Sequence, residues 1–349
     1  MAQNIKKFCL YDGHVFAVIP VADEVTPEES HNLSTQVLPD GIRDKNIIIA
    51  ALASECLNTD ALVSVGSMIY SVGRIVYNEQ METEPNNEVT KFDPTQPEVQ
   101  LESCCNMIQP RKSPALISFG GIIYAFGGLA TDIENCMECP WAEFLDTNKP
   151  IKEQKWKALK EPVLRLSLSL QPCAIRYDAE NILIMGGTKF GEGAILYNVA
   201  NESSKVYNFS PMPWYGKVDH VAIFGEKTVY CISHDYLFAY ELDKQIRYIA
   251  DMNSMIPHFD HRFWTSSLGP VLVHLKDNLF NIFALASAFD PERTRIVECI
   301  KFRATKVNKN SIKNWGSPGS SDRVLHLDLL GYQYYRCDLL WNLWGAVPM

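Results

Sequence analysis

The sequence lacks the features that direct a chain to a membrane or to secretion. No segment near the N-terminus is apolar for long enough to be a signal peptide, and no run approaches the ~18 apolar residues of a membrane-spanning helix. The 10 cysteines follow no disulfide-framework spacing, which fits a reducing compartment. We therefore expect a cytoplasmic protein, with the nucleus as a second location, whose sequons at Asn32, Asn201 and Asn208 stay unmodified.

A surplus of basic residues is also missing, as are the motifs that hold nucleotide cofactors. The 32 Lys and Arg residues are outnumbered by 41 Asp and Glu, for a net charge of −9, which argues against a nucleic-acid partner. There is no glycine-rich phosphate loop, nucleophile elbow or dinucleotide fingerprint, so no cofactor is expected. The 47% hydrophobic and 21% charged composition is that of an ordinary globular protein.

The strongest local pattern lies at residues 111–128. Two short apolar runs are separated by Gly120-Gly121, and the second run ends at Gly127-Gly128. Glycine supplies the positive φ that a tight hairpin turn requires, so this segment predicts two antiparallel strands. We expect the second glycine pair to lie where a side chain would crowd its neighbour.

Weaker copies of this hairpin recur along the whole chain. Counted on one residue of the second strand, the copies are spaced by 54, 54, 60, 46 and 50 residues, at Phe16, Tyr70, Tyr124, Ile184, Tyr230 and Phe280. After each of the first five comes a strand that ends in an acid or amide, at 36–40, 89–93, 143–146, 195–198 and 238–243. A fourth strand follows, for example at Trp156 and at 205–209. Four strands in a period near 50 residues indicate a radial β-repeat.

The repeat resembles that of kelch proteins, most closely plant kelch proteins over residues 70–156. The matching positions are Met107, Arg111, Tyr124, Gly127-Gly128 and Trp156. A second double glycine stands at Gly186-Gly187. The resemblance implies an all-β, kelch-type β-propeller of six four-stranded blades, with a degenerate seventh blade as the alternative.

We expect one propeller domain over residues 1–349, whose blades are approximately 6–56, 60–110, 111–164, 165–216, 217–258 and 259–316. Closing strands at 322–345 are expected to pair with the N-terminal blade and to remove its exposed edge. Kelch propellers often follow an F-box or BTB domain. Because the first strand begins by Phe8, we expect no ubiquitin-ligase adaptor domain in the chain.

Strand order predicts where a site would lie. If strands a to d run antiparallel, the b–c and d–a connections share one face, and the b–c connections at 74–88, 129–140, 188–194 and 284–294 are long. Polar and aromatic residues near the d–a connections are therefore the candidates for ligand binding: Arg111, Arg165, Trp214, Lys217, His258, Arg262 and Trp264. As acid/base residues we consider His220 and His261, oriented by Asp219 and Asp260.

Structural interpretations remain open for these residues. Arg111 and Arg165 can instead bond neighbouring blades, as basic residues at this place commonly do in kelch propellers, and the aromatic residues can pack between blades. The cluster His258, Asp260 and His261 is not expected to form a three-ligand metal site by itself, because in an extended strand His261 points away from the other two. Pairing of His258 or His261 with Asp219 and His220 across the channel stays open as an alternative.

No metal site is expected. The iron-binding Glu-x-x-x-Asp-x-x-x-His signature of nitrile-specifier kelch proteins is absent, since Asp322 and His326 follow a proline, Pro318, where the glutamate should be. Cys136 and Cys139, with Cys104-Cys105, leave zinc, a redox pair or ordinary thiols open.

Three functions follow from these patterns. The first is a recognition protein that binds a protein, a peptide or a small molecule at the face formed by the b–c and d–a connections. The second is a stand-alone enzyme that performs isomerisation, cyclisation or elimination on a small molecule of plant specialised metabolism. A third is competition with F-box kelch proteins for their clients.

Overall fold

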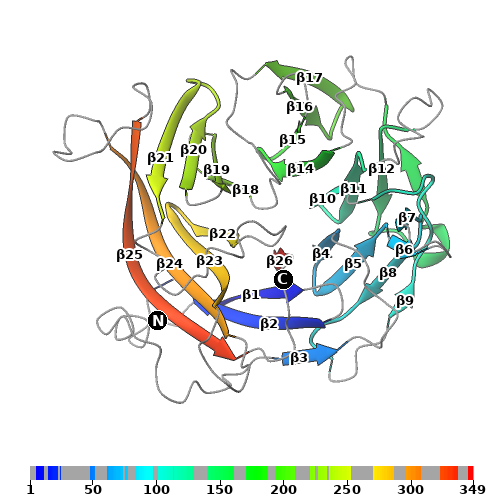
Figure 1. The fold of residues 1–349 in the computed structure, drawn as a ribbon. Coiled ribbons are helices and arrows are strands. Elements are labelled where there is room, and N and C mark those ends of the chain that lie inside the picture. Colours follow the sequence, from blue (N-terminus) through cyan, green and yellow to red (C-terminus); the bar gives the residue numbers. More distant parts are fainter. Residues whose placement is uncertain are drawn as a thin grey trace. The chain divides into compact units, whose positions relative to one another are not determined.

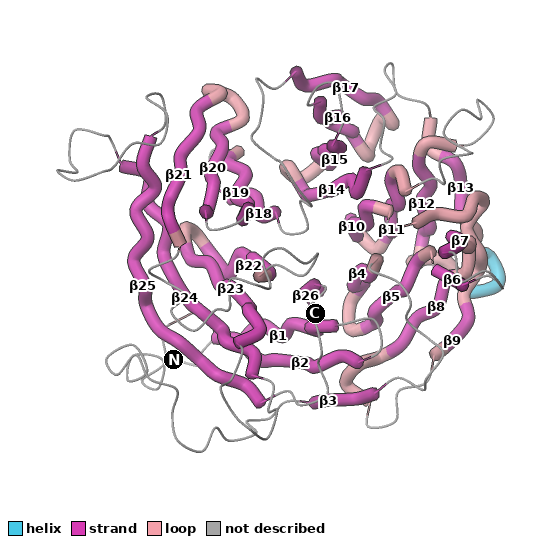
Figure 2. The backbone as a smooth tube through the Cα atoms, viewed as in Figure 1, coloured by secondary structure: helices cyan, strands magenta, loops and turns pink. Residues whose placement is uncertain are grey.

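In the residues that the computed structural model describes, the regular secondary structure is almost entirely β-strand (Figure 2). The structure describes residues 5–11, 15–22, 24, 48–51, 61–73, 75–77, 83–96, 101–112, 114–128, 140–160, 170–187, 193–208, 221–224, 227–233, 236–252, 270–286, 296–307, 323–336 and 345–348. Within these ranges the one helical element is the 3-10 helix η1 (Ile151–Glu153). The all-β class predicted from the sequence is confirmed.

The chain divides into two compact units. Unit 1 contains Met1–Asp12, Ala17–Ile49 and His220–Ala346, and unit 2 contains Gly13–Phe16, Ala50–Asp219 and Val347–Met349.

Unit 2 holds three antiparallel sheets of four strands in which sheet order equals chain order (Figure 1). The first consists of β4 (Leu62–Val65), β5 (Met68–Val72), β8 (Val89–Phe92) and β9 (Glu102–Ser103). The second consists of β10 (Ala115–Phe119), β11 (Ile122–Phe126), β12 (Ala142–Asp146) and β13 (Trp156–Ala158). The third consists of β14 (Leu170–Arg176), β15 (Asn181–Gly187), β16 (Gly193–Asn198) and β17 (Ser203–Asn208). A small hairpin, β6 (Ile75–Tyr77) with β7 (Thr83–Pro85), lies in the connection between β5 and β8.

Apolar layers join neighbouring sheets of unit 2. The layer between the second and third sheets is aromatic, with Phe126 5.5 Å from Trp141 and 6.2 Å from Tyr197 between ring centroids. Because Ile123 and Ala125 face the first sheet and Tyr124 and Phe126 face the third, β11 is buried on both faces. This explains why the second strand of the repeat is an unbroken apolar run.

Unit 1 holds an eight-stranded sheet made of two four-stranded meanders. Its order is β18 (Val221–Phe224), β19 (Thr228–Ser233), β20 (Tyr236–Glu241), β21 (Ile246–Asp251), β25 (Arg323–Arg336), β24 (Ile296–Val307), β23 (Leu279–Ala286) and β22 (Val271–Lys276). The meanders meet in a short parallel pairing of β21 with β25, in which Tyr248 lies opposite Arg323. An ion pair between Lys306 of β24 and Glu241 of β20 links them again.

The remaining sheet has the order β26 (Gly345–Pro348), β1 (Ile5–Tyr11), β2 (Val15–Ala22) and β3 (Ile48–Ala51). The tail was expected to pair with the N-terminal strands over 322–345, and the pairing differs in detail. Residues 323–336 form β25, which pairs along its length with β24 and so covers the edge that this long strand would leave open. The strand beside β1 is β26, from the last residues of the chain.

The predicted repeat register holds in five of six units. Tyr70, Tyr124, Ile184, Tyr230 and Phe280 each lie in the second strand of their meander. Phe16 lies in β2, which is the third strand in order, because β26 occupies the first place in that sheet. The third strands predicted at 89–93, 143–146, 195–198 and 238–243 are present, whereas 36–40 lies outside the described residues.

The two glycine pairs behave as the sequence predicted. Gly120 and Gly121 have φ of 61° and 78° and form the turn between β10 and β11. Gly128 has φ of 68°, and a Cβ built there would lie 2.5 Å from the carbonyl oxygen of Lys112 and 2.8 Å from the nitrogen of Pro114. The first pair therefore allows the turn, and the second allows close approach of two backbone segments.

Candidate functional site

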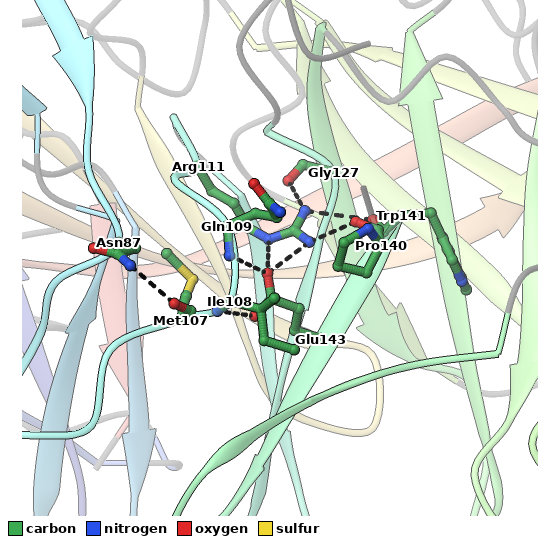
Figure 3. Close-up of polar contacts among 9 residues, drawn as sticks. All are labelled: Asn87, Met107, Ile108, Gln109, Arg111, Gly127, Pro140, Trp141 and Glu143. Atoms are coloured by element: carbon green, nitrogen blue, oxygen red, sulfur yellow. Dashed lines mark hydrogen bonds and ion pairs between the residues drawn. The ribbon is translucent and has the colours of Figure 1, made fainter. Parts of the chain in front are cut away.

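Arg111 lies in the connection that leads from β9 to β10, and its side chain is fully buried. Its Nε and Nη2 both lie 2.9 Å from Oε1 of Glu143, whose side chain is also fully buried. Nη1 donates to the carbonyl of Gly127 at 2.7 Å, and Nη2 donates to the carbonyl of Pro140 at 2.8 Å (Figure 3). The guanidinium thus combines a buried ion pair with hydrogen bonds to backbone carbonyls at the ends of β11 and β12.

Glu143 also accepts hydrogen bonds from the backbone of the connection that carries Arg111. Its Oε2 accepts the backbone N–H of Ile108 at 2.6 Å, and its Oε1 accepts that of Gln109 at 3.2 Å. Glu143 is the second residue of β12 and lies opposite Ala125 of β11. With a cation and two amide donors around it, the carboxylate is compensated for the loss of water.

The same connection is bonded to the preceding sheet. The N–H of Met107 donates to the carbonyl of Asn87 at 2.8 Å, and the Asn87 amide donates back to the carbonyl of Met107 at 3.0 Å. The N–H of Arg111 donates to the carbonyl of Asn86 at 3.3 Å. Residues 107–111 are therefore hydrogen-bonded through their backbone to the end of the 74–88 connection, at Asn86 and Asn87. Through the Arg111 side chain they are bonded to Pro140, at the end of the 129–140 connection.

This arrangement defines a surface that we call the connection face: residues 104–112, with Asn86 and Asn87 on one side and Gly127 and Pro140 on the other. The d–a connection and the stems of two b–c connections lie together there, as strand order predicted. The Ile108 side chain is 44% exposed on this face although its backbone is fixed. A second exposed apolar residue, Ile151, is 71% exposed in η1, which lies between the third and fourth strands at the other end of the sheet.

The cysteine pair on the connection face is in the thiol form. Cys104 and Cys105 are free and half-buried, and burial raises the pKa of both thiols, that of Cys104 to about 11. Thiolate, the reactive form, is therefore scarce at neutral pH. No group of three or more His, Cys, Asp or Glu that could hold a metal occurs in the described part of the chain. Cys136 and Cys139 lie outside that part.

Of the candidate residues predicted from the sequence, Arg111 is the one that falls within the described ranges. Its contacts match the structural interpretation, since it bonds one sheet through its backbone and the next through its guanidinium. The other ten lie outside the described residues: Arg165, Trp214, Lys217, Asp219, His220, His258, Asp260, His261, Arg262 and Trp264. Sequence reasoning missed Glu143, although a buried arginine requires an anion and Glu143 is an acid at the start of a predicted strand.

Comparisons with known proteins assign no family to this chain. No model of a known protein family matches the chain, and no curated protein matches it significantly. Among the described residues, no helix has the length and apolar character needed to cross a membrane.

Proposed function

We propose that the protein is a kelch-type β-propeller that recognises a protein or peptide partner at the connection face. The observation that carries this proposal is Ile108, an exposed apolar side chain on a segment fixed by the buried pair of Arg111 and Glu143. An anchor that is already ordered loses little conformational entropy on binding, and such side chains supply much of the energy of interfaces.

The strand arrangement supports the propeller part of the proposal. Apart from the β6–β7 hairpin, the described strands form six groups of four, if the eight-stranded sheet is counted as its two meanders. We propose that these are six blades and that β26 closes the ring beside β1. The kelch assignment rests on residues at the matching positions, among them Arg111, Gly128 and Trp156, whose indole donates to the carbonyl of Cys105 at 3.0 Å.

The contacts of Arg111 favour recognition over catalysis on this face. Its guanidinium is engaged with Glu143 and backbone carbonyls, so it would have to leave those partners to bind an anionic substrate. The acid/base interpretation rests on His220, His261, Asp219 and Asp260 and gains no support from the described residues.

Replacing Ile108 by aspartate is expected to weaken partner capture strongly while leaving the fold intact. Immobilised wild-type protein, Ile108→Asp and Ile151→Asp are compared by quantitative mass spectrometry of proteins retained from a cell extract. We expect a partner that wild type and Ile151→Asp retain equally and that Ile108→Asp retains at least about tenfold less, the usual effect of losing an interface hot spot. Equal capture by all three proteins of matching thermal stability would refute the proposed face.

A further inference from the structure

Glu298 is a fully buried acid in the middle of the eight-stranded sheet of unit 1. It belongs to β24 and lies opposite Ala284 of β23 and Tyr334 of β25. Within the described part of the chain, neither carboxyl oxygen has a hydrogen-bond partner of good geometry, and the buried hydroxyl of Tyr334 has none either. Such a group is costly in its ionised form, because nothing replaces the water that it has lost.

Glu143 provides a direct internal comparison. Both glutamates are fully buried, both stand in the third strand of a four-stranded meander, and both face an alanine of the second strand. Glu143 receives a guanidinium and two amide N–H groups, which stabilise its charge. Among the described residues Glu298 has no cation and no amide N–H beside it, and only the neutral Tyr334 hydroxyl lies near its carboxyl group. The buried carboxyl group is therefore favoured in its protonated, neutral form.

Among the described residues, no cation pairs with the Glu298 carboxyl group. On the neighbouring strand β25, the register places Tyr334 opposite Glu298, Tyr332 opposite Ile300 and Arg336, at the end of the strand, opposite Ile296. Burial raises the pKa of both phenols, so both stay neutral. Unit 1 has one large apolar cluster between its strands, which includes Phe280, Ile300 and Phe302. On β23, Ile282 and Ala284 belong to this cluster.

The other meander adds Tyr230 and Tyr248 to this cluster, and Tyr248 bonds Glu241 at 3.4 Å. The nearby cations are engaged elsewhere: Lys306 with Glu241, and Lys301 with the carbonyl of Glu24.

We propose that Glu298 is a proton-operated switch in the pairing of β24 with β25. When protonated, it packs as a neutral side chain in the apolar cluster. When it loses the proton, the carboxylate can regain water if β25 separates locally from β24 around Tyr332–Arg336. Burial raises the pKa of the Glu298 carboxyl to about 7, although the nearby Tyr334 hydroxyl opposes the shift, so the transition falls near neutral pH.

The direction of the pH effect follows from linkage. The pKa in the closed state lies above the ordinary value of 4.5, so the closed state binds the proton more tightly than the open state. The stabilisation by protonation is complete below about pH 4.5 and is lost as the pH rises towards 7. Local opening of β25 should therefore increase about five- to tenfold per pH unit between pH 5 and 7 and little above pH 8.

Amide hydrogen exchange of β25 tests this inference between pH 5 and 8. After correction for intrinsic exchange rates, wild type and the exposed-acid control Asp243→Asn should show the rise in opening. Glu298→Gln and the apolar variant Glu298→Met should show flat profiles. Equal profiles for wild type and both Glu298 variants would overturn the proposal.

Infrared difference spectroscopy of the wild-type protein supplies a readout that does not depend on any variant folding. A carboxylic-acid carbonyl band should be present at pH 5 and disappear as the pH is raised through about 7, and Glu298→Gln identifies the band by its loss. A Glu298 that is already ionised at pH 5 would show that a hidden donor stabilises the carboxylate, and the switch would be excluded.

Discussion

Replacing Arg111 by methionine is expected to lower the free energy of unfolding of unit 2 by about 3–5 kcal/mol. The substitution keeps much of the apolar volume and removes the charge, which leaves the Glu143 carboxylate buried without its cation. It also removes the donors to the carbonyls of Gly127 and Pro140. Denaturant unfolding followed by a unit 2 probe such as Trp156, which is buried in the adjoining apolar layer, measures the loss.

Two further variants separate the charge from the hydrogen bonds. Arg111→Lys keeps the charge but cannot present the planar fork of donors, so we expect it to recover part of the loss. Many buried ion pairs can be replaced by apolar residues at little cost. Here the double variant Arg111→Met/Glu143→Leu should remain destabilised by about 2–3 kcal/mol, because the N–H groups of Ile108 and Gln109 lose their acceptor.

The surface pair of Lys91 and Glu102 is the matched control. Their charged atoms are 3.1 Å apart across β8 and β9, and the Glu102 side chain is 60% exposed. Lys91→Met should therefore cost at most about 1 kcal/mol. If Lys91→Met and Arg111→Met lower the free energy of unfolding equally, the buried pair of Arg111 and Glu143 does not fix the connection face.

A single added methyl group at Gly128 is expected to cost about 3 kcal/mol. An alanine at φ of 68° is strained by about 1–2 kcal/mol, and its Cβ would meet backbone atoms of Lys112 and Pro114 that cannot turn aside. Those atoms belong to the connection that carries Arg111, so the clash should also loosen the connection face.

Gly120 in the same hairpin controls for backbone strain alone. Its φ is 61°, close to that of Gly128, but no atom lies within 4 Å of the position that a Cβ would occupy. Gly120→Ala should therefore cost only about 1–2 kcal/mol. Equal free energies of unfolding for the two alanine variants would show that the crowding at Gly128 is relieved elsewhere.

Local patterns in the sequence predicted the meanders well. Hairpin glycines and unbroken apolar second strands are short-range signals, and they located β10 and β11 as well as the second strands that contain Tyr70 and Ile184. The partner of a terminal strand depends instead on long-range pairing. For that reason 323–336 was expected beside the N-terminal strands, whereas it pairs with β24.

The candidate site was predicted less completely than the fold. Arg111 stands out because it begins the strongest hairpin, but its role depends on Glu143, 32 residues later in the chain. The pairing of the two residues requires the sheet to be formed, because Glu143 reaches the connection from the third strand. Glu298 carries no local signal at all, since only its burial and its lack of donors distinguish it from a surface acid.

The position of β26 has a consequence for the order of events during synthesis. β1, β2 and β3 are synthesised well before β26, the strand that completes their sheet, because all strands from β4 to β25 lie between them in the chain. At about 5–20 residues per second, the three early strands wait on the order of tens of seconds for their partner. The three sheets of unit 2 each consist of strands that are close together in the chain, with only the β6–β7 hairpin interrupting the first, and they can form within that interval. Among the described strands, nascent β1–β3 is therefore the group with the greatest need for protection by chaperones.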